Sequence, residues 1–101
     1  ILEQLKRKKV GKNIYFQNLR HPDYVLKHPI SVFLECEKNK VIATCYDIDM
    51  YGSGDSEEEA IDDLCEVITE YYESLEEDEG KLGPLPQKHW VFLKRIIEKN
   101  I

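Results

Sequence analysis

The sequence has no run of apolar residues long enough to span a membrane, and it has few cysteines, the residues that link small folds through disulfides. A transmembrane helix needs about 20 consecutive, mostly apolar residues, and the 101 residues contain no such run. The first residues, ILEQLKRKK, have the wrong order of charge and apolarity for a secretory signal peptide. We therefore expect a cytoplasmic protein with no membrane partner.

Cysteine is scarce, and its spacing excludes the usual cysteine-based sites. Cys36, Cys45 and Cys65 are odd in number and form no CxxC pair, which argues against a disulfide framework and against a cysteine metal site. We interpret all three as small buried apolar residues. The three histidines share no ligand-like spacing either, so we expect neither a metal ion nor a cofactor.

Basic residues are almost absent from the middle of the chain. Residues 29–80 hold two lysines against seventeen acidic residues, whereas residues 1–28 carry a charge of +5 and residues 81–101 a charge of +4. The net charge is −6. An acidic body between basic ends can be neutralised within the fold, between subunits or by a partner, and direct contact between this body and nucleic acid is unfavourable.

Two β-rich runs in residues 30–48 predict a hairpin. The polar pair Lys38-Asn39 separates them and suits a two-residue turn. Pairing Glu37 with Lys40 places the apolar alternate residues of both runs on one face, which sets the register. Residues 13–19 are β-prone, residues 21–29 are read as an extended connection between prolines, and residues 50–54 form a short third strand or bend.

The segment after the second glycine of MYGSG predicts a long helix over residues 56–77. Asp55, Ser56 and Glu59 fit a capping box at its start. Apolar residues recur at a spacing of three and four, as one buried helix face requires: Ile61, Leu64, Ile68, Tyr71 and Leu75. The opposite side is acidic throughout and holds no lysine or arginine, so its carboxylates repel one another.

A second helix is predicted over residues 86–99, with proline in its first turn. Trp90, Leu93, Ile96 and Ile97 form its apolar stripe. These elements predict an α+β fold in which a small antiparallel sheet packs on the long helix. We interpret residues 1–101 as a single domain with a basic N-terminal extension (1–28), a core (29–79) and a C-terminal helix (80–101).

The string from Asp47 to Leu64 resembles the HicB-type antitoxin family. The matching residues are Asp47-Ile48-Asp49, then Ser53-Gly54-Asp55-Ser56, then Glu58-Glu59-Ala60 followed by Ile61 and Leu64. The resemblance covers about residues 30–75 and implies a partial RNase-H-like fold. It also implies binding to a small basic HicA-type toxin, an RNA-cleaving protein of double-stranded-RNA-binding fold. The residues after Gly80 are too few for the DNA-binding domain that many such antitoxins carry.

The resemblance and the acidic helix face together predict a binding protein rather than an enzyme. The candidate partner-binding residues are Asp62, Asp63, Glu66, Glu70 and Glu73, which would mimic RNA phosphates and dock on a basic partner. The alternative is an orphan member of the fold that associates with itself. A homodimer or higher oligomer is expected in either case, with Tyr71, Tyr72 and Trp90 as candidate interface residues.

Two further hypotheses stay open at this point. Asp47, Asp49 and Asp55 lie close in sequence and could gather a divalent ion for phosphodiester cleavage, although no histidine or lysine lies nearby to act as acid or base. The basic N-terminal residues, from Lys6 to Lys12, could instead contact nucleic acid.

Overall fold

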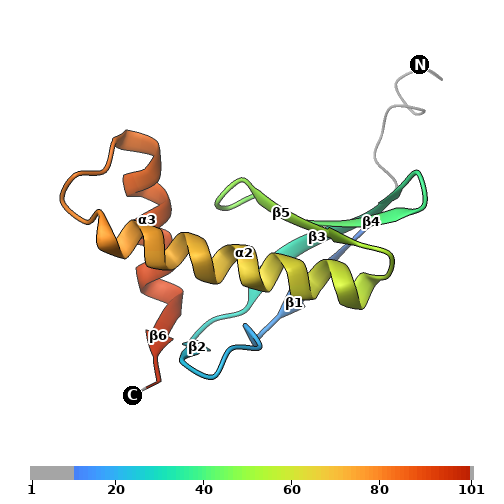
Figure 1. The fold of residues 1–101 in the computed structure, drawn as a ribbon, viewed down its shortest axis with the longest axis horizontal. Coiled ribbons are helices and arrows are strands. Elements are labelled where there is room, and N and C mark those ends of the chain that lie inside the picture. The colour runs from blue at the N-terminus through green and yellow to red at the C-terminus, as the bar shows by residue number, and fades with distance from the viewer. Residues whose placement is uncertain (1–10, 101) are drawn as a thin grey trace.

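The computed structural model describes residues 11–100, in which a four-stranded antiparallel sheet carries a long helix across one face (Figure 1). Within these residues six strands and two helices follow in chain order: β1 (Gly11–Phe16), β2 (Tyr24–Leu26), β3 (Ile30–Glu37), β4 (Lys40–Cys45), β5 (Met50–Gly54), α2 (Glu57–Glu77), α3 (Pro84–Ile96) and β6 (Ile97–Lys99). The strand order is β1-β3-β4-β5, and β2 pairs separately with β6. The predicted α+β class is confirmed.

The hairpin of β3 and β4 has the register that the sequence predicts. Glu37 pairs with Lys40 and Leu34 with Ala43. Lys38 and Asn39 both have positive φ, at 50° and 68°, as a two-residue hairpin turn requires. The second strand is shorter than predicted, because the chain leaves β4 after Cys45 and turns before β5 begins at Met50.

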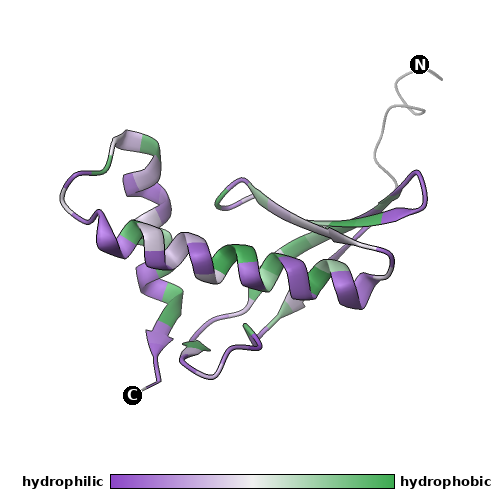
Figure 2. Ribbon diagram, in the orientation of Figure 1, coloured by the Kyte–Doolittle hydropathy of each residue, from purple (hydrophilic) through white to green (hydrophobic). Residues whose placement is uncertain are grey.

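One face of the sheet and one side of α2 share the apolar core. Alternate residues of β3 and β4 point into it, and so do the apolar residues of the helix stripe. Hydrophobic and hydrophilic segments accordingly alternate along α2 in Figure 2. Tyr71 of that stripe is only partly buried, whereas Tyr72 is 6% exposed and takes the more central position.

Cys36 corrects the prediction that all three cysteines are buried. Cys45 and Cys65 are buried, but Cys36 is exposed. It pairs with Val41 of β4 close to the hairpin turn, next to exposed Glu37. The core does not reach the Cys36 side chain at this end of the hairpin.

The described part of the predicted N-terminal extension belongs to the fold. β1 pairs with β3 along six residues, from Gly11 opposite Glu35 to Phe16 opposite Ile30. Leu19 and Leu26 are buried in the same core as the helix stripe. Strand pairing therefore extends back to Gly11 and core packing to Ile14, so the described residues before residue 29 pack as part of the same fold as the predicted core.

The C-terminal segment also differs from the prediction. α3 begins at Pro84 and ends at Ile96, and the following residues Ile97–Lys99 form β6 rather than a last helical turn. β6 pairs with β2, so Leu26 lies opposite Ile97. The predicted apolar stripe of Trp90, Leu93, Ile96 and Ile97 is buried. Among residues 11–100, no helix has the length and apolarity needed to cross a membrane.

Candidate interaction site on the long helix

The start of α2 has the predicted cap. Ser56 is the N-cap, and its Oγ accepts a hydrogen bond from the backbone N–H of Glu59 at 3.2 Å. Glu59 Oε1 in turn accepts from the backbone N–H of Asp55 at 2.8 Å. Glu57, Glu58 and Glu59 occupy the first turn, where carboxylates interact favourably with the helix dipole. The capping hydrogen bonds and the helix dipole thus account for the acids at this end of the helix.

Acids on the flank of α2 that faces the β1–β2 connection and β6 pair with cations of the chain itself. Arg20 binds both Glu58 and Asp62. The hydrogen bond to Asp62 raises the pKa of the Arg20 guanidinium above its ordinary value. Further along, Lys99 Nζ lies 2.8 Å from Glu76 Oε2, and this hydrogen bond raises the pKa of Lys99.

The two ends of the helix are neutralised in the same way. Lys12 Nζ lies 3.1 Å from Glu57 Oε2 at the start. Just beyond the end, Glu79 accepts hydrogen bonds from Trp90 Nε1 and Lys94 Nζ, both at 3.0 Å. The hydrogen bond from Trp90 has the largest effect and that from Lys94 the next, and both lower the pKa of the Glu79 carboxyl. The basic ends of the sequence therefore serve partly as internal counterions.

The outward side of α2 keeps its charge. Six carboxylates follow one another there at spacings of four and three residues, which places them on one side of a helix, and we name them the acidic strip: Glu59, Asp63, Glu66, Glu70, Glu73 and Glu77. Within residues 11–100 none of the six forms an ion pair. The strip is thus the part of the acidic body that the chain does not neutralise.

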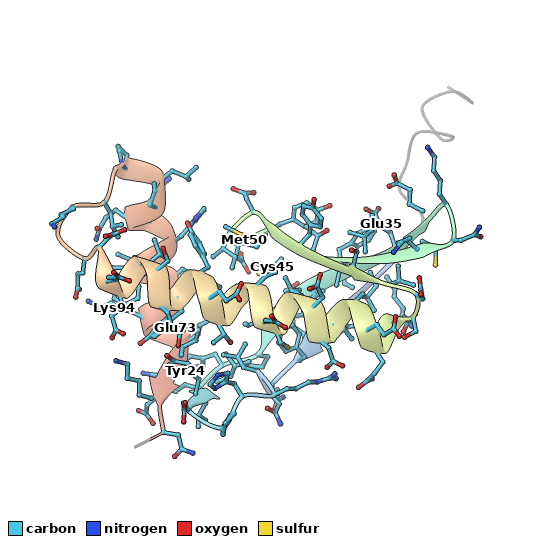
Figure 3. The ribbon with its side chains drawn as sticks, viewed as in Figure 1. Tyr24, Glu35, Cys45, Met50, Glu73 and Lys94 are labelled. Atoms are coloured by element: carbon cyan, nitrogen blue, oxygen red, sulfur yellow. The ribbon has the colours of Figure 1, made fainter. Side chains whose placement is uncertain are left out.

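Neutral donors hold three members of the acidic strip in place, and the first is Glu59, which accepts the bond from the backbone N–H of Asp55. Asp63 Oδ2 accepts a bond of 2.9 Å from the backbone N–H of Ser53. Glu73 Oε2 accepts a bond of 2.7 Å from the hydroxyl of Tyr24, and the two side chains meet below the helix in Figure 3. Burial and the Glu73 bond raise the pKa of the Tyr24 phenol. A neutral donor orients a carboxylate without cancelling its charge.

A hollow of about 390 Å³ lies between α2 and the connection from β1 to β2. Buried side chains of Leu19, Cys65 and Thr69 line it, together with His21 and four acids of the helix, namely Asp62, Glu66, Glu70 and Glu73. An apolar lining under a carboxylate rim suits a side chain with an aliphatic stem and a cationic tip, as in lysine or arginine.

The structure separates the five predicted partner-binding residues. Asp63, Glu66, Glu70 and Glu73 belong to the acidic strip, whereas Asp62 is bound by Arg20.

Two of the three predicted interface residues lie inside the chain's own core: Tyr72 is 6% and Trp90 3% exposed, and their rings pack on each other with centroids 5.2 Å apart. They offer no surface to another subunit, so the prediction for these two residues is corrected. Tyr71 is partly buried, and its hydroxyl lies 2.6 Å from His89 Nδ1.

The aspartates of the hydrolase hypothesis do not share one site. Asp47 and Asp49 lie in the turn before β5, and Asp55 lies after β5. Asp49 faces His89, with Oδ2 and Nε2 3.8 Å apart, and Asp55 faces Lys40. In the part of the chain that the structure describes, no three histidine, cysteine, aspartate or glutamate side chains are grouped to hold a metal ion.

Sequence reasoning missed the residues that divide the acids into a neutralised flank and a charged strip. Arg20, Tyr24 and Lys99 contact residues of α2 that differ from them by 38, 49 and 23 in residue number. No short-range pattern joins residues at such separations. The basic ends and the acidic middle of the sequence indicate that ion pairs could form between them. This difference in charge does not show which basic residue pairs with which acid.

The exposed cysteine gives a direct test of this description. Burial raises the pKa of both Cys45 and Cys65 to about 11, so their thiols stay protonated and covered near pH 8. Cys36 lies on the wall of a second hollow of about 360 Å³ and is exposed. We expect one thiol per native chain to react rapidly with a disulfide reagent, and three after denaturation. Fast reaction of more than one thiol, or loss of the reactive thiol only from a variant other than Cys36→Ser, would contradict the assignment.

Comparisons with protein-family models, with curated proteins and with solved structures find no match to this chain.

Proposed function

We propose that this chain is a HicB-like antitoxin, or a related binding protein, that neutralises a small basic HicA-type toxin. In this proposal the acidic strip of α2 covers the basic face with which the toxin cleaves RNA. The observation that carries the proposal is the division of charge on α2. The chain's own cations pair with acids of the flank and the ends, while six outward carboxylates have no ion pair within residues 11–100.

The spacing of the acidic strip supports mimicry of a phosphate backbone. From Glu59 to Glu77 the helix rises about 27 Å, at about 1.5 Å per residue. Six charges over that length give about one charge per 5 Å, compared with about one per 3.4 Å along one strand of a duplex. A toxin face that binds RNA phosphates would therefore meet charges of the same sign at a similar density.

The energetics of the bare helix point the same way. Five neighbouring pairs of like charge occur along the acidic strip, each destabilising by a few tenths of a kcal/mol, or about 1–2 kcal/mol in total. A basic partner relieves this repulsion when it binds. Electrostatic complementarity of this kind mainly raises the association rate and the specificity of a complex.

The hollow beside the acidic strip offers a place for one anchor residue. Buried Leu19 and Cys65 provide apolar contact, and Glu66 and Glu70 stand at its edge. An arginine or lysine of the toxin could insert its stem there and pair its charge with these carboxylates. Desolvated anchors of this type supply much of the binding energy of protein interfaces.

Co-expression with a HicA-type toxin tests the proposal. The toxin encoded beside this chain's gene, or failing that a panel of such toxins, is induced in bacterial cells with and without this chain. We expect growth to be restored, and the toxin to co-purify with the chain. Continued growth arrest without co-purification, although both proteins are present and this chain is folded by circular dichroism, would reject antitoxin function.

A second candidate is the orphan, self-associating member of the fold. Three exposed tyrosines, Tyr15, Tyr46 and Tyr51, favour it, because tyrosine is enriched at protein interfaces. The two functions are compatible, because these tyrosines lie outside α2, which carries the acidic strip.

A further inference from the structure

Arg20 shows how a pair of carboxylates on α2 binds a guanidinium group. Its Nη1 atom donates a hydrogen bond of 2.8 Å to Glu58 Oε1 and a second one to Asp62 Oδ1. The two acids are four residues apart, so they are neighbours on one side of the helix. Their side chains remain 73% and 56% exposed. The first pair of acids on this flank therefore binds a cation of the chain itself at the surface of the protein.

The turn around Arg20 holds this cation against the helix. Arg20 has a φ of 58°, a left-handed value that residues other than glycine seldom adopt. Its backbone N–H donates a hydrogen bond of 2.7 Å to Asn18 Oδ1, and the preceding Leu19 is 2% exposed. A cation that is tethered in this way has a high effective concentration at its site. A cation of a partner therefore competes poorly with Arg20 for Asp62.

The next pair along the helix, Glu66 and Glu70, has the same spacing and no cation. Within residues 11–100 neither side chain forms an ion pair or accepts a hydrogen bond. Both line the hollow of about 390 Å³, and no lysine or arginine of the described residues lines it. The helix thus repeats the spacing of the pair that Arg20 occupies, about 12 Å further along its axis.

The buried side of the hollow favours arginine over lysine. Leu19 and Cys65 are each 2% exposed and line the hollow together with the acids. The aliphatic stem of an arginine packs on such a surface. Its guanidinium is less strongly hydrated than the ammonium of lysine, so it loses less hydration in a partly covered site. The planar group also presents several N–H donors, which can reach two carboxylates at once.

We propose that Glu66 and Glu70 form a guanidinium site that binds one arginine side chain of a basic partner, as Glu58 and Asp62 bind Arg20. The inference rests on the proposed function only for the identity of that partner as a toxin, and it narrows the anchor residue to arginine. It also determines where the partner docks. Arg20 excludes the partner from the first pair of acids, so the arginine enters at the middle of the acidic strip.

Two peptides of equal charge, heptaarginine and heptalysine, test the site without the toxin. In calorimetric titrations of the full chain at low salt, we expect heptaarginine to bind about fivefold more tightly. In Glu66→Gln with Glu70→Gln the preference should fall below about twofold, because the paired carboxylates are lost. Both positions are exposed, so circular dichroism should stay unchanged. A preference that is absent from the wild type, or that persists in this variant, overturns the proposal.

The matched control is Glu37→Gln with Glu98→Gln, which removes the same charge from exposed positions on β3 and β6. This variant should keep the preference for heptaarginine. Loss of the preference in the control as well would show that overall charge determines it, and would also overturn the proposal.

The variant Arg20→Gln tests the comparison between the two pairs of acids. We expect heptaarginine to change the amide chemical shifts of Glu58 and Asp62 in this variant and not in the wild type, because the first pair becomes free. Shifts of these two residues that do not respond to the peptide in the variant would contradict the comparison.

The guanidinium site and the antitoxin function can fail separately. A toxin that binds, while the peptides show no difference, would reject the site and leave the function. A preference for heptaarginine that depends on Glu66 and Glu70, without any binding of a toxin, would leave the site and reject the function.

Discussion

A single methyl group added at position 52 should destabilise this fold by about 3 kcal/mol, near the upper end of the usual cost of overpacking. Gly52 lies on β5 where α2 crosses the sheet. A Cβ atom there would lie 2.3 Å from the backbone nitrogen of Leu64, 2.7 Å from its Cα and 2.8 Å from the carbonyl oxygen of Ala60. These are backbone atoms of a helix and cannot rotate away as a side chain can. The Gly52→Ala variant must therefore lift α2 from the sheet.

Urea unfolding of Gly52→Ala beside Gly83→Ala measures this effect. Gly83 has a φ of −71° and nothing within 4 Å of its added Cβ, so its variant should lie within about 1 kcal/mol of the wild type. For a domain of this size, 3 kcal/mol corresponds to a fall of roughly 12–24 °C in melting temperature. Equal stabilities of the two variants would show that α2 and β5 are not in such close contact.

Reversal of two charges at the middle of the acidic strip should weaken toxin binding by about 30-fold. Glu66 and Glu70 are exposed and have no ion pair within residues 11–100. Each substitution by lysine removes about 0.5 kcal/mol of attraction to a basic face and adds a similar repulsion. The sum is about 2 kcal/mol for the two sites, hence the factor of about 30. The fold should be unaffected, because like-charge repulsion along the strip is relieved.

The matched control for Glu66→Lys with Glu70→Lys is Glu37→Lys with Glu98→Lys. These exposed acids lie on β3 and β6, and their reversal changes the net charge by the same amount. Affinities are compared by calorimetry at two salt concentrations. A loss of similar size in both variants would indicate that overall charge, and not the acidic strip, determines affinity.

The elements with strong local signals could be predicted from the sequence. α2 has a capping residue, an uninterrupted apolar period and no internal glycine or proline, so its bounds differ from the prediction by one residue. The β3–β4 hairpin has a turn pair that tolerates positive φ and an alternation that only one register satisfies. Each signal lies within about twenty residues, and neither requires knowledge of distant contacts.

The elements that depend on distant pairing could not be predicted. Residues 13–19 looked β-prone, but nothing local shows that β1 lies beside β3 and not at the other edge of the sheet. Ile97 continues the apolar stripe of α3, and this pattern predicts a helix over residues 86–99. Pairing of β6 with β2 instead ends the helix at Ile96, because tertiary contacts override weak local preference at helix ends.

The candidate site was predictable in its chemistry but not in its boundaries. Acids at helical spacing with no intervening lysine or arginine predicted a charged face. The position of Arg20 decides that Asp62 belongs to the neutralised flank, and the position of Tyr24 fixes Glu73 without removing its charge. The burial of Trp90 against Tyr72 likewise depends on how α3 packs on α2, which no sequence pattern specifies.

Amide chemical shifts, recorded while a HicA-type toxin is added to the isotope-labelled chain, test the proposed division of surfaces most directly. We predict that the shifts of α2 residues in and beside the acidic strip, from Glu59 to Glu77, change strongly, while those of the sheet residues Phe33, Thr44 and Tyr51 stay constant. Changes concentrated on these sheet residues, with α2 unaffected, would contradict the proposed role of the strip.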